Sequence, residues 1–190
     1  MSTPRLTELI ERSCDHEGQL ATLTYDYKKV HNGEMFNFSE YDADTDIASP
    51  KQISITTGDN DIGLEIGIAA SGGVTVNLGE NMAVGTGGSA NAGTAVTGYN
   101  RNRSAKHVSK TIDVAVKKDF IYGSSGNTAG TIIHYDYLPG STQGALKVGG
   151  VGRSAIAFIL RAHTMYSLVI TAIADNTLLG WTLDMHEEIE

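Results

Sequence analysis

The sequence of 190 residues contains one cysteine, three prolines and one tryptophan. Because Cys14 is alone, no disulfide can form within the chain, which excludes a small fold stapled by disulfides. No run approaches the ~18 apolar residues of a membrane span, and the segment MSTPRLTELIERS lacks the apolar core of a secretory signal. We therefore expect a protein that is made and kept soluble in a cytoplasm and that has no membrane partner.

Positive charge is scarce as well. The chain has 14 Lys and Arg against 22 Asp and Glu, which gives a formal net charge of -8. Binding to nucleic acid through its phosphates requires clustered basic residues, so this balance argues against a nucleic-acid partner. An acidic surface suits solubility or a protein partner that carries basic patches.

Motifs that carry chemistry are missing. The six histidines are scattered without zinc-site spacing, and no G-x-S-x-G nucleophile elbow occurs. The Gly-rich segment 85–98 lacks the lysine of a phosphate-binding loop. We predict that the protein is not an enzyme and that it has no catalytic residues, cofactor or metal. A Ser/His/Asp triad assembled by the fold, or a carboxylate pair such as Asp136 and Asp184, is the enzymatic alternative.

The segment 34–50 is acidic and irregular. Asp42, Asp44 and Asp46 alternate as the ligands of a calcium loop do. The sixth position of such a loop is not Gly here, and Ile53 stands at the twelfth position, where a bidentate Glu is needed. The pattern favours a solvated loop or strand edge over a metal site.

Glycine and short alternating apolar runs are abundant. The sequence has 22 Gly, and apolar residues recur with a period of two, which is typical of half-buried strands. In the run 149–188 this pattern predicts three successive antiparallel strands with one buried face. The Gly72-Gly73 pair predicts a hairpin between two strands. The strands predicted elsewhere cover residues 20–30, 53–57, 62–69, 74–78, 108–117 and 131–138.

No helical segment separates these strands, so the crossovers of a parallel sheet are excluded. The predicted fold class is therefore all-β, a single antiparallel β-sandwich or jelly roll with a short N-terminal helix or arm. We place an arm of a short helix plus a strand at residues 1–32 and the β-sandwich domain at residues 33–190.

The N-terminal arm contains the first candidate partner site. Thr3 and Pro4 are typical of a helix start, and the helix is predicted to end near Ser13. A helix this short is marginal alone, so it has to dock on its own domain or on a neighbouring subunit. The candidate partner-binding residues share one helical face and are Leu6, Leu9 and Ile10.

The segment YNRNRS contains the second candidate. In an extended chain Arg101 and Arg103 lie on one side, and Asn100 and Asn102 lie on the other. The arginines could bind carboxylates of a partner bidentately. Equally, the asparagines could build a turn that leaves the arginines solvated. A glycan-binding platform would need several exposed aromatic residues, and the pattern alone does not say which tyrosines are exposed.

Three separated motifs resemble a group of tailed-bacteriophage virion proteins of similar size. They are YNRNRS at Tyr99–Ser104 after Gly85-Thr86, FILRAHTMYSLVIT at Phe158–Thr171, and Leu183-Asp184 with a closing Glu187. Their order and spacing match over roughly residues 33–187. The family usually has Pro or Gln and then Asn where this chain has Ala162-His163, and an aromatic pair where it has Met185-His186. Trp181 is the candidate to replace the missing aromatic residues.

The resemblance implies a structural protein of the virion, most plausibly a head decoration or cement protein. Such proteins are often trimeric jelly rolls on the outside of the head, so a homo-oligomer, favoured as a trimer, and contact with the major capsid protein are expected. The protein would be made in the host cytoplasm and located in the virion. The alternatives are a trimeric β-sandwich module of a tail or fibre that binds a host glycan and, third, a hydrolase.

Overall fold

The computed structural model describes residues 29–84, 93–107, 109–119, 128–139 and 150–188, with the backbone alone for 150–157. The predicted helix with Leu6, Leu9 and Ile10 lies outside the described residues, and so does Cys14. None of the described helical residues forms a segment long and apolar enough to cross a membrane.

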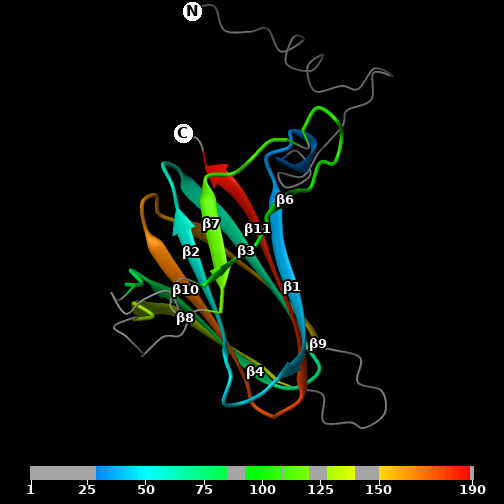
Figure 1. The fold of residues 1–190 in the computed structure, drawn as a ribbon, viewed down its shortest axis with the longest axis vertical. Coiled ribbons are helices and arrows are strands. Elements are labelled where there is room, and N and C mark those ends of the chain that lie inside the picture. Colours follow the sequence, from blue (N-terminus) through cyan, green and yellow to red (C-terminus); the bar gives the residue numbers. More distant parts are fainter. Residues whose placement is uncertain (1–28, 85–92, 108, 120–127, 140–149, 189–190) are drawn as a thin grey trace, which may run out of the picture.

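Two antiparallel sheets pack against each other, so the predicted all-β antiparallel sandwich is confirmed (Figure 1). In spatial order, the five-stranded sheet contains β6 (Tyr99–Asn100), β1 (Phe36–Thr45), β11 (Thr177–Glu188), β3 (Asp61–Ala70) and β9 (Gly150–Leu160). The six-stranded sheet contains β5 (Thr94–Ala95), β7 (Val114–Lys118), β2 (Lys51–Thr57), β10 (Met165–Ala172), β4 (Val74–Glu80) and β8 (Thr131–Leu138).

The strand pairing follows a simple order. The first four long strands, β1 to β4, pair in reverse order with the last four, β11 to β8. Successive strands within each half belong to alternate sheets. The two halves of the chain therefore run side by side as one long double ribbon that folds over itself, and each turn between strands is a corner of the sandwich.

The period-two pattern determines the core between the sheets. On β3 the residues Ile62, Leu64, Ile66 and Ile68 are all buried, and the glycines and Glu65 between them face outward. The six-stranded sheet contributes an equivalent inner face. The buried apolar residues of that face include Ile53, Ile55, Val74, Val76, Leu78, Val116, Tyr166, Leu168 and Ile170.

The hairpin predicted at Gly72-Gly73 is wrong. β3 pairs with β11 and β9, whereas β4 pairs with β10 and β8 in the other sheet. Neither glycine has a positive φ; among described glycines only Gly33, Gly93 and Gly130 do. The turn instead contacts a neighbouring corner, because Ile173 N–H donates to Gly73 O at 2.9 Å. Alternation identifies a strand with one buried face, and a corner strand has the same pattern as a hairpin strand.

The three strands predicted in the run 149–188 are present as β9, β10 and β11, but they do not form one sheet. β9 and β11 flank β3, whereas β10 lies between β2 and β4 in the opposite sheet. β9 also begins at Gly150, earlier than its apolar alternation indicates. Both sheets need an apolar inner face, so successive strands alternate between them with no change in their own pattern.

The start of the described chain differs from the prediction too. Lys29–His31 are helical, so the predicted strand 20–30 is wrong at its end. Gly33, at φ 67°, and Glu34 donate their N–H groups to Val30 O and Lys29 O at 3.0 and 2.9 Å. These two bonds form a Schellman motif, in which a left-handed glycine ends a helix. The turn signal at Gly33 was correct, but the element that it ends is a helix.

Two further boundaries are corrected. The acidic segment 34–50 contains β1, whose Phe36 and Phe38 are buried, so it is not irregular. The strand predicted at 108–117 begins only at Val114. Charged residues at alternate positions of β1 hide the apolar pattern, because Glu40 and Asp42 form ion pairs across the sandwich instead of contacting water alone.

Candidate functional site

The three motifs of the resemblance meet at one end of the sandwich. We call this the motif end and define it by residues 57–61, 101, 113, 161–166, 184 and 187. It is the upper end in Figure 1, where β2 and β9 finish and β10 starts. The YNRNRS segment lies beside β1 there, FILRAHTMYSLVIT forms β9, the corner and β10, and Asp184 and Glu187 lie on β11.

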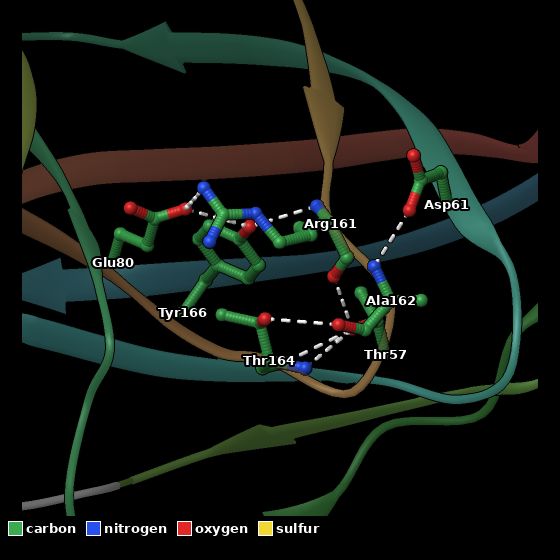
Figure 2. Close-up of polar contacts among 7 residues, drawn as sticks. All are labelled: Thr57, Asp61, Glu80, Arg161, Ala162, Thr164 and Tyr166. Atoms are coloured by element: carbon green, nitrogen blue, oxygen red, sulfur yellow. Dashed lines mark hydrogen bonds and ion pairs between the residues drawn. The ribbon is translucent and has the colours of Figure 1, made fainter.

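The corner between β9 and β10 is held by hydroxyl groups (Figure 2). Thr57 Oγ1 donates to Arg161 O at 2.7 Å and accepts Thr164 N–H at 3.0 Å. Thr164 Oγ1 donates to Ala162 O at 3.0 Å, and Asp61 Oδ1 accepts Ala162 N–H at 2.8 Å. A corner strand loses its ladder partners, so these side chains satisfy backbone groups that the sheets do not.

Tyr166 continues this network into the core. Its hydroxyl accepts Arg161 N–H at 2.8 Å and donates to Glu80 Oε1 at 3.1 Å (Figure 2). The Arg161 guanidinium lies 3.8 Å from the same carboxylate. Burial, followed by the Glu80 carboxylate, raises the pKa of Tyr166, and the amide of Arg161 opposes this shift. The hydroxyl therefore stays protonated and joins β10, β4 and the corner.

His163 explains one departure from the family pattern. It has a φ of 53°, in the left-handed region, and its N–H donates to Gly58 O at 2.9 Å. Asn adopts this conformation more readily than most residues, so the Asn that the resemblance leads us to expect here would fit this corner. The corner keeps its shape with His, since the side chain is exposed.

In the YNRNRS segment the asparagines build the turn. Asn100 is buried, and its Nδ2 donates to Gly33 O at 2.8 Å while its Oδ1 accepts Asn102 N–H at 2.8 Å. Arg101 and Arg103 are both exposed, in a segment that is a turn and not an extended strand. Arg101 Nη1 lies 3.4 Å from Asp184 Oδ2, which links the first motif to the third.

The third motif is connected to the corner by backbone amides. Glu187 Oε1 accepts Asp113 N–H at 3.0 Å, and Asp113 O accepts Gly58 N–H at 2.9 Å. Asp113 Oδ2 also accepts Asp59 N–H at 3.1 Å. Sequence patterns did not single out Asp113, because it precedes β7 without any motif of its own. Hydrogen bonds therefore connect Glu187 to the corner of the second motif.

The second departure, at Met185-His186, lies in the middle of a sheet. Met185 is fully buried in the core, and the largely buried His186 ring lies over Gly63, where a Cβ would come within 2.3 Å of the ring. Trp181 is also buried on the inner face, 3% exposed. β11 therefore has an aromatic core residue at Trp181, before Met185-His186, where the proteins that the motifs resemble usually have an aromatic pair.

The acidic residues of β1 serve the sandwich itself. Asp42 pairs with Lys51, and Glu40 pairs with Lys118, so both bridge the two sheets. The Lys51 hydrogen bond, helped by the Asp44 amide, lowers the pKa of Asp42.

Among described residues, no three His, Cys, Asp or Glu side chains gather as a metal site. Asp136 and Asp184 lie in different sheets, on β8 and β11.

A shallow depression of about 550 Å³ lies on the outer face of the five-stranded sheet. Its floor includes Gly67, Ala69 and Gly180, and Tyr41 stands beside it with 64% of its surface exposed. A Cβ at Gly180 would meet only ordinary contacts at 3.9 Å, so the fold does not require glycine there. The period-two pattern could not reveal this depression, because the pattern does not say which strands lie side by side in a sheet.

Comparison with known proteins gives no relative. No family model matches the sequence, and no curated protein or solved structure matches it significantly. The resemblance to phage virion proteins therefore depends on the three sequence motifs alone.

Proposed function

We propose that the protein is a structural component of a bacteriophage virion, a decoration or cement protein that binds the outside of the head. The observation that carries this proposal is the meeting of the three motifs at the motif end. Their side chains form turns and corner bonds there, so the motifs that carry the resemblance are ones on which the fold depends. Motif residues that stabilise the fold, with no catalytic role, suit a structural protein that acts by binding to the outside of the head.

The sandwich is, in this proposal, a jelly roll. Pairing of β1 to β4 with β11 to β8 in reverse order is the double ribbon that a jelly roll wraps into two sheets. β7 then extends the six-stranded sheet beyond the eight wrapped strands. This architecture supports the proposal without specifying it, since one fold serves many functions.

The proposed mechanism is mechanical. Each copy bridges neighbouring subunits of the major capsid protein and adds buried interface that opposes the outward pressure of packaged DNA. Arg101 and Arg103 are the proposed contacts in the described part, because guanidinium groups bind carboxylates bidentately. Arg103 Cζ lies 5.9 Å from the Tyr99 ring centroid, so a contact there would involve both side chains. Leu6, Leu9 and Ile10 are the proposed contacts in the arm.

Cryo-electron microscopy of the virion tests the location directly. Density for this chain on the outer surface of the head supports the proposal, and density confined to the tail contradicts it. Co-sedimentation with heads that lack the protein tests the contacts. Arg103→Glu is expected to reduce binding, whereas Lys106→Glu, an equal change of charge a few residues away on the exposed surface, is the matched control. Deletion of residues 1–13 tests the arm, and unchanged affinity would refute its docking role.

A second candidate function has its own observation. The exposed Tyr41 ring stands beside a floor of glycine and alanine with the hydroxyls of Ser39 and Thr182 at its margin. Such a surface could stack on a sugar ring, as expected of a tail or fibre module that recognises a host glycan. A glycan array distinguishes the two functions: binding that Tyr41→Ala abolishes favours the glycan module, and no binding to any glycan contradicts it.

A further inference from the structure

β8 is a sheet edge with unusual exposure. It is the outermost strand of the six-stranded sheet, and its sequence, TIIHYDYL, has Asp136 as its one carboxylate and no Lys, Arg, Glu or Pro. Its large apolar side chains are nevertheless open: Tyr135 is 63% exposed and Tyr137 53%, with Ile132 and Ile133 nearly as accessible. Edge strands of monomers are usually protected by charge, proline or shortness, and the opposite edge, β5, has only two residues.

The backbone of β8 also has hydrogen-bonding groups directed at the open edge. Tyr137 is opposite Thr75 of β4, yet its N–H donates to Asp136 Oδ1 at 2.7 Å and not to β4. Backbone groups of successive residues point to opposite sides of a strand, so Tyr135 directs its N–H and C=O to the same open edge. The Asp136 carboxylate thus occupies a donor that another strand could use.

Two charged or chargeable side chains flank Tyr135. His134 and Asp136 are opposite the buried Leu78 and Val76 of β4, so both lie on the inner side of the strand. The His134 ring packs edge-on against Phe158, with centroids 5.4 Å apart. Its buried Nε2 has no hydrogen-bond partner among the described residues. A base and an acid thus lie two positions apart at the open edge, on one side of the strand.

We infer that β8 pairs with β8 of a second copy of this chain, antiparallel about a two-fold axis at Tyr135. Both strands then present their open-edge backbone groups to each other at Tyr135. In this register His134 of each copy is opposite Asp136 of the other, in a pair without backbone bonds, where side chains approach most closely. Registers centred on His134 or Asp136 would instead place like residues opposite each other. The match of an imidazole with a carboxylate in both cross-strand pairs therefore favours a second copy as the occupant and this register.

The contact joins two six-stranded sheets into one continuous sheet. It brings together the exposed apolar side chains of β8 from the two copies. Because the contact is two-fold, it closes with two copies and gives a dimer, not the trimer that the phage resemblance implies. The inference does not depend on the virion function, since it uses β8 alone.

Sedimentation velocity of the full chain, from about 1 to 100 µM, tests the pairing. The unaltered protein is expected to be a dimer within this range. His134→Asp places Asp opposite Asp twice and should weaken the dimer about ten- to a hundredfold. The double variant His134→Asp/Asp136→His exchanges the two residues and restores both pairs, so it is expected to dimerise again. A role of these residues in the fold alone predicts no such rescue.

A second variant separates pairing from folding. Tyr137→Pro removes an N–H that β4 does not use, and proline is tolerated at the open side of an edge strand. It should abolish the dimer while thermal unfolding and circular dichroism show a folded protein. A monomeric unaltered protein, a trimer, or a dimer that neither His134→Asp nor Tyr137→Pro weakens would overturn the inference. A double variant that stays monomeric would overturn the register.

Discussion

The two ends of the sandwich differ in how deeply some of their closing hydrogen bonds are buried. At the motif end, Thr57 and Tyr166 are buried and bond to backbone groups of the β9–β10 corner. At the opposite end, the lower one in Figure 1, the half-buried Asp46 and the exposed Asp175 accept backbone amides in hydrogen bonds that are exposed. Asp46 Oδ1 accepts Asn176 N–H at 3.1 Å, and Asp175 Oδ1 accepts Ile47 N–H at 3.0 Å. We call this the aspartate end and define it by residues 46–47, 71–73 and 174–177.

The difference concerns what replaces a lost bond. At the aspartate end water can bond to any amide that loses its carboxylate, so the cost of a broken contact is small. At the motif end the bond from Thr164 N–H to Thr57 Oγ1 is buried, so this amide would stay buried without a partner, which costs its desolvation. The comparison therefore predicts that equal numbers of bonds have unequal weight at the two ends.

The largest effect is expected for Thr57→Val. This change keeps the shape of the side chain but removes the acceptor of Thr164 N–H and the donor to Arg161 O. The free energy of unfolding should fall by about 2–3 kcal/mol, measured by denaturant titration. Thr57→Ser keeps the hydroxyl and is the control, with an expected loss of about 1 kcal/mol for the missing methyl. Equal losses in both variants would contradict the role of the hydroxyl.

Tyr166→Phe comes next. The Arg161 amide loses its acceptor, and the partly exposed Glu80 keeps some access to water, so the expected loss is about 1–2 kcal/mol. Tyr99→Phe, on an exposed ring, should change stability little.

The raised pKa of Tyr166 adds a pH test. The Tyr166 hydroxyl holds its proton to a higher pH in the folded state than in the unfolded state. The stability that this difference contributes is present below the ordinary tyrosine pKa of about 10 and is lost as the pH rises past it. The Phe variant should lose stability less steeply in that range.

Asp46→Ala should have a smaller effect. It removes the acceptor of Asn176 N–H at an exposed position, and water can replace it. We expect a loss of about 0.5 kcal/mol, and Asp175→Ala should behave alike. The measurement is denaturant titration under the conditions used for Thr57→Val. A loss as large as that of Thr57→Val would remove the distinction between the two ends.

The smallest effect is a gain. His163→Asn places a residue that tolerates a left-handed φ at the exposed tip of the motif-end corner. Stability should rise by about 0.3–0.5 kcal/mol, which a thermal melt can detect as a small increase in Tm. His163 Nε2 lies 3.8 Å from the exposed carboxylate of Asp59. A decrease in Tm would show that this contact outweighs the backbone preference.

Much of the fold was predictable from local pattern. The strand at 131–138 has the predicted bounds, and the strands near 53–57, 62–69 and 74–78 differ by a few residues. β1 was missed because Glu40 and Asp42 occupy inward positions and bond to lysines of other strands. That information lies in residues far along the chain, which a window of ten residues does not contain. The turn built by the asparagines around Arg101 was one of the two predicted outcomes, whereas the bond from Arg101 to Asp184 was not predictable.

The sequence by itself determined that the chain is all-β and antiparallel, because a period of two and the lack of helices between strands are local properties. Only the tertiary structure decided which strands are neighbours. A strand with one apolar face fits a hairpin and a sandwich corner equally well, so Gly72-Gly73 could not reveal that it joins two sheets. The choice is made where distant segments meet, as Thr57 and Thr164 do at the motif end. Contacts between residues far apart in the chain decide which strands become neighbours, because the sequence around one residue of such a pair does not indicate which residue it will contact.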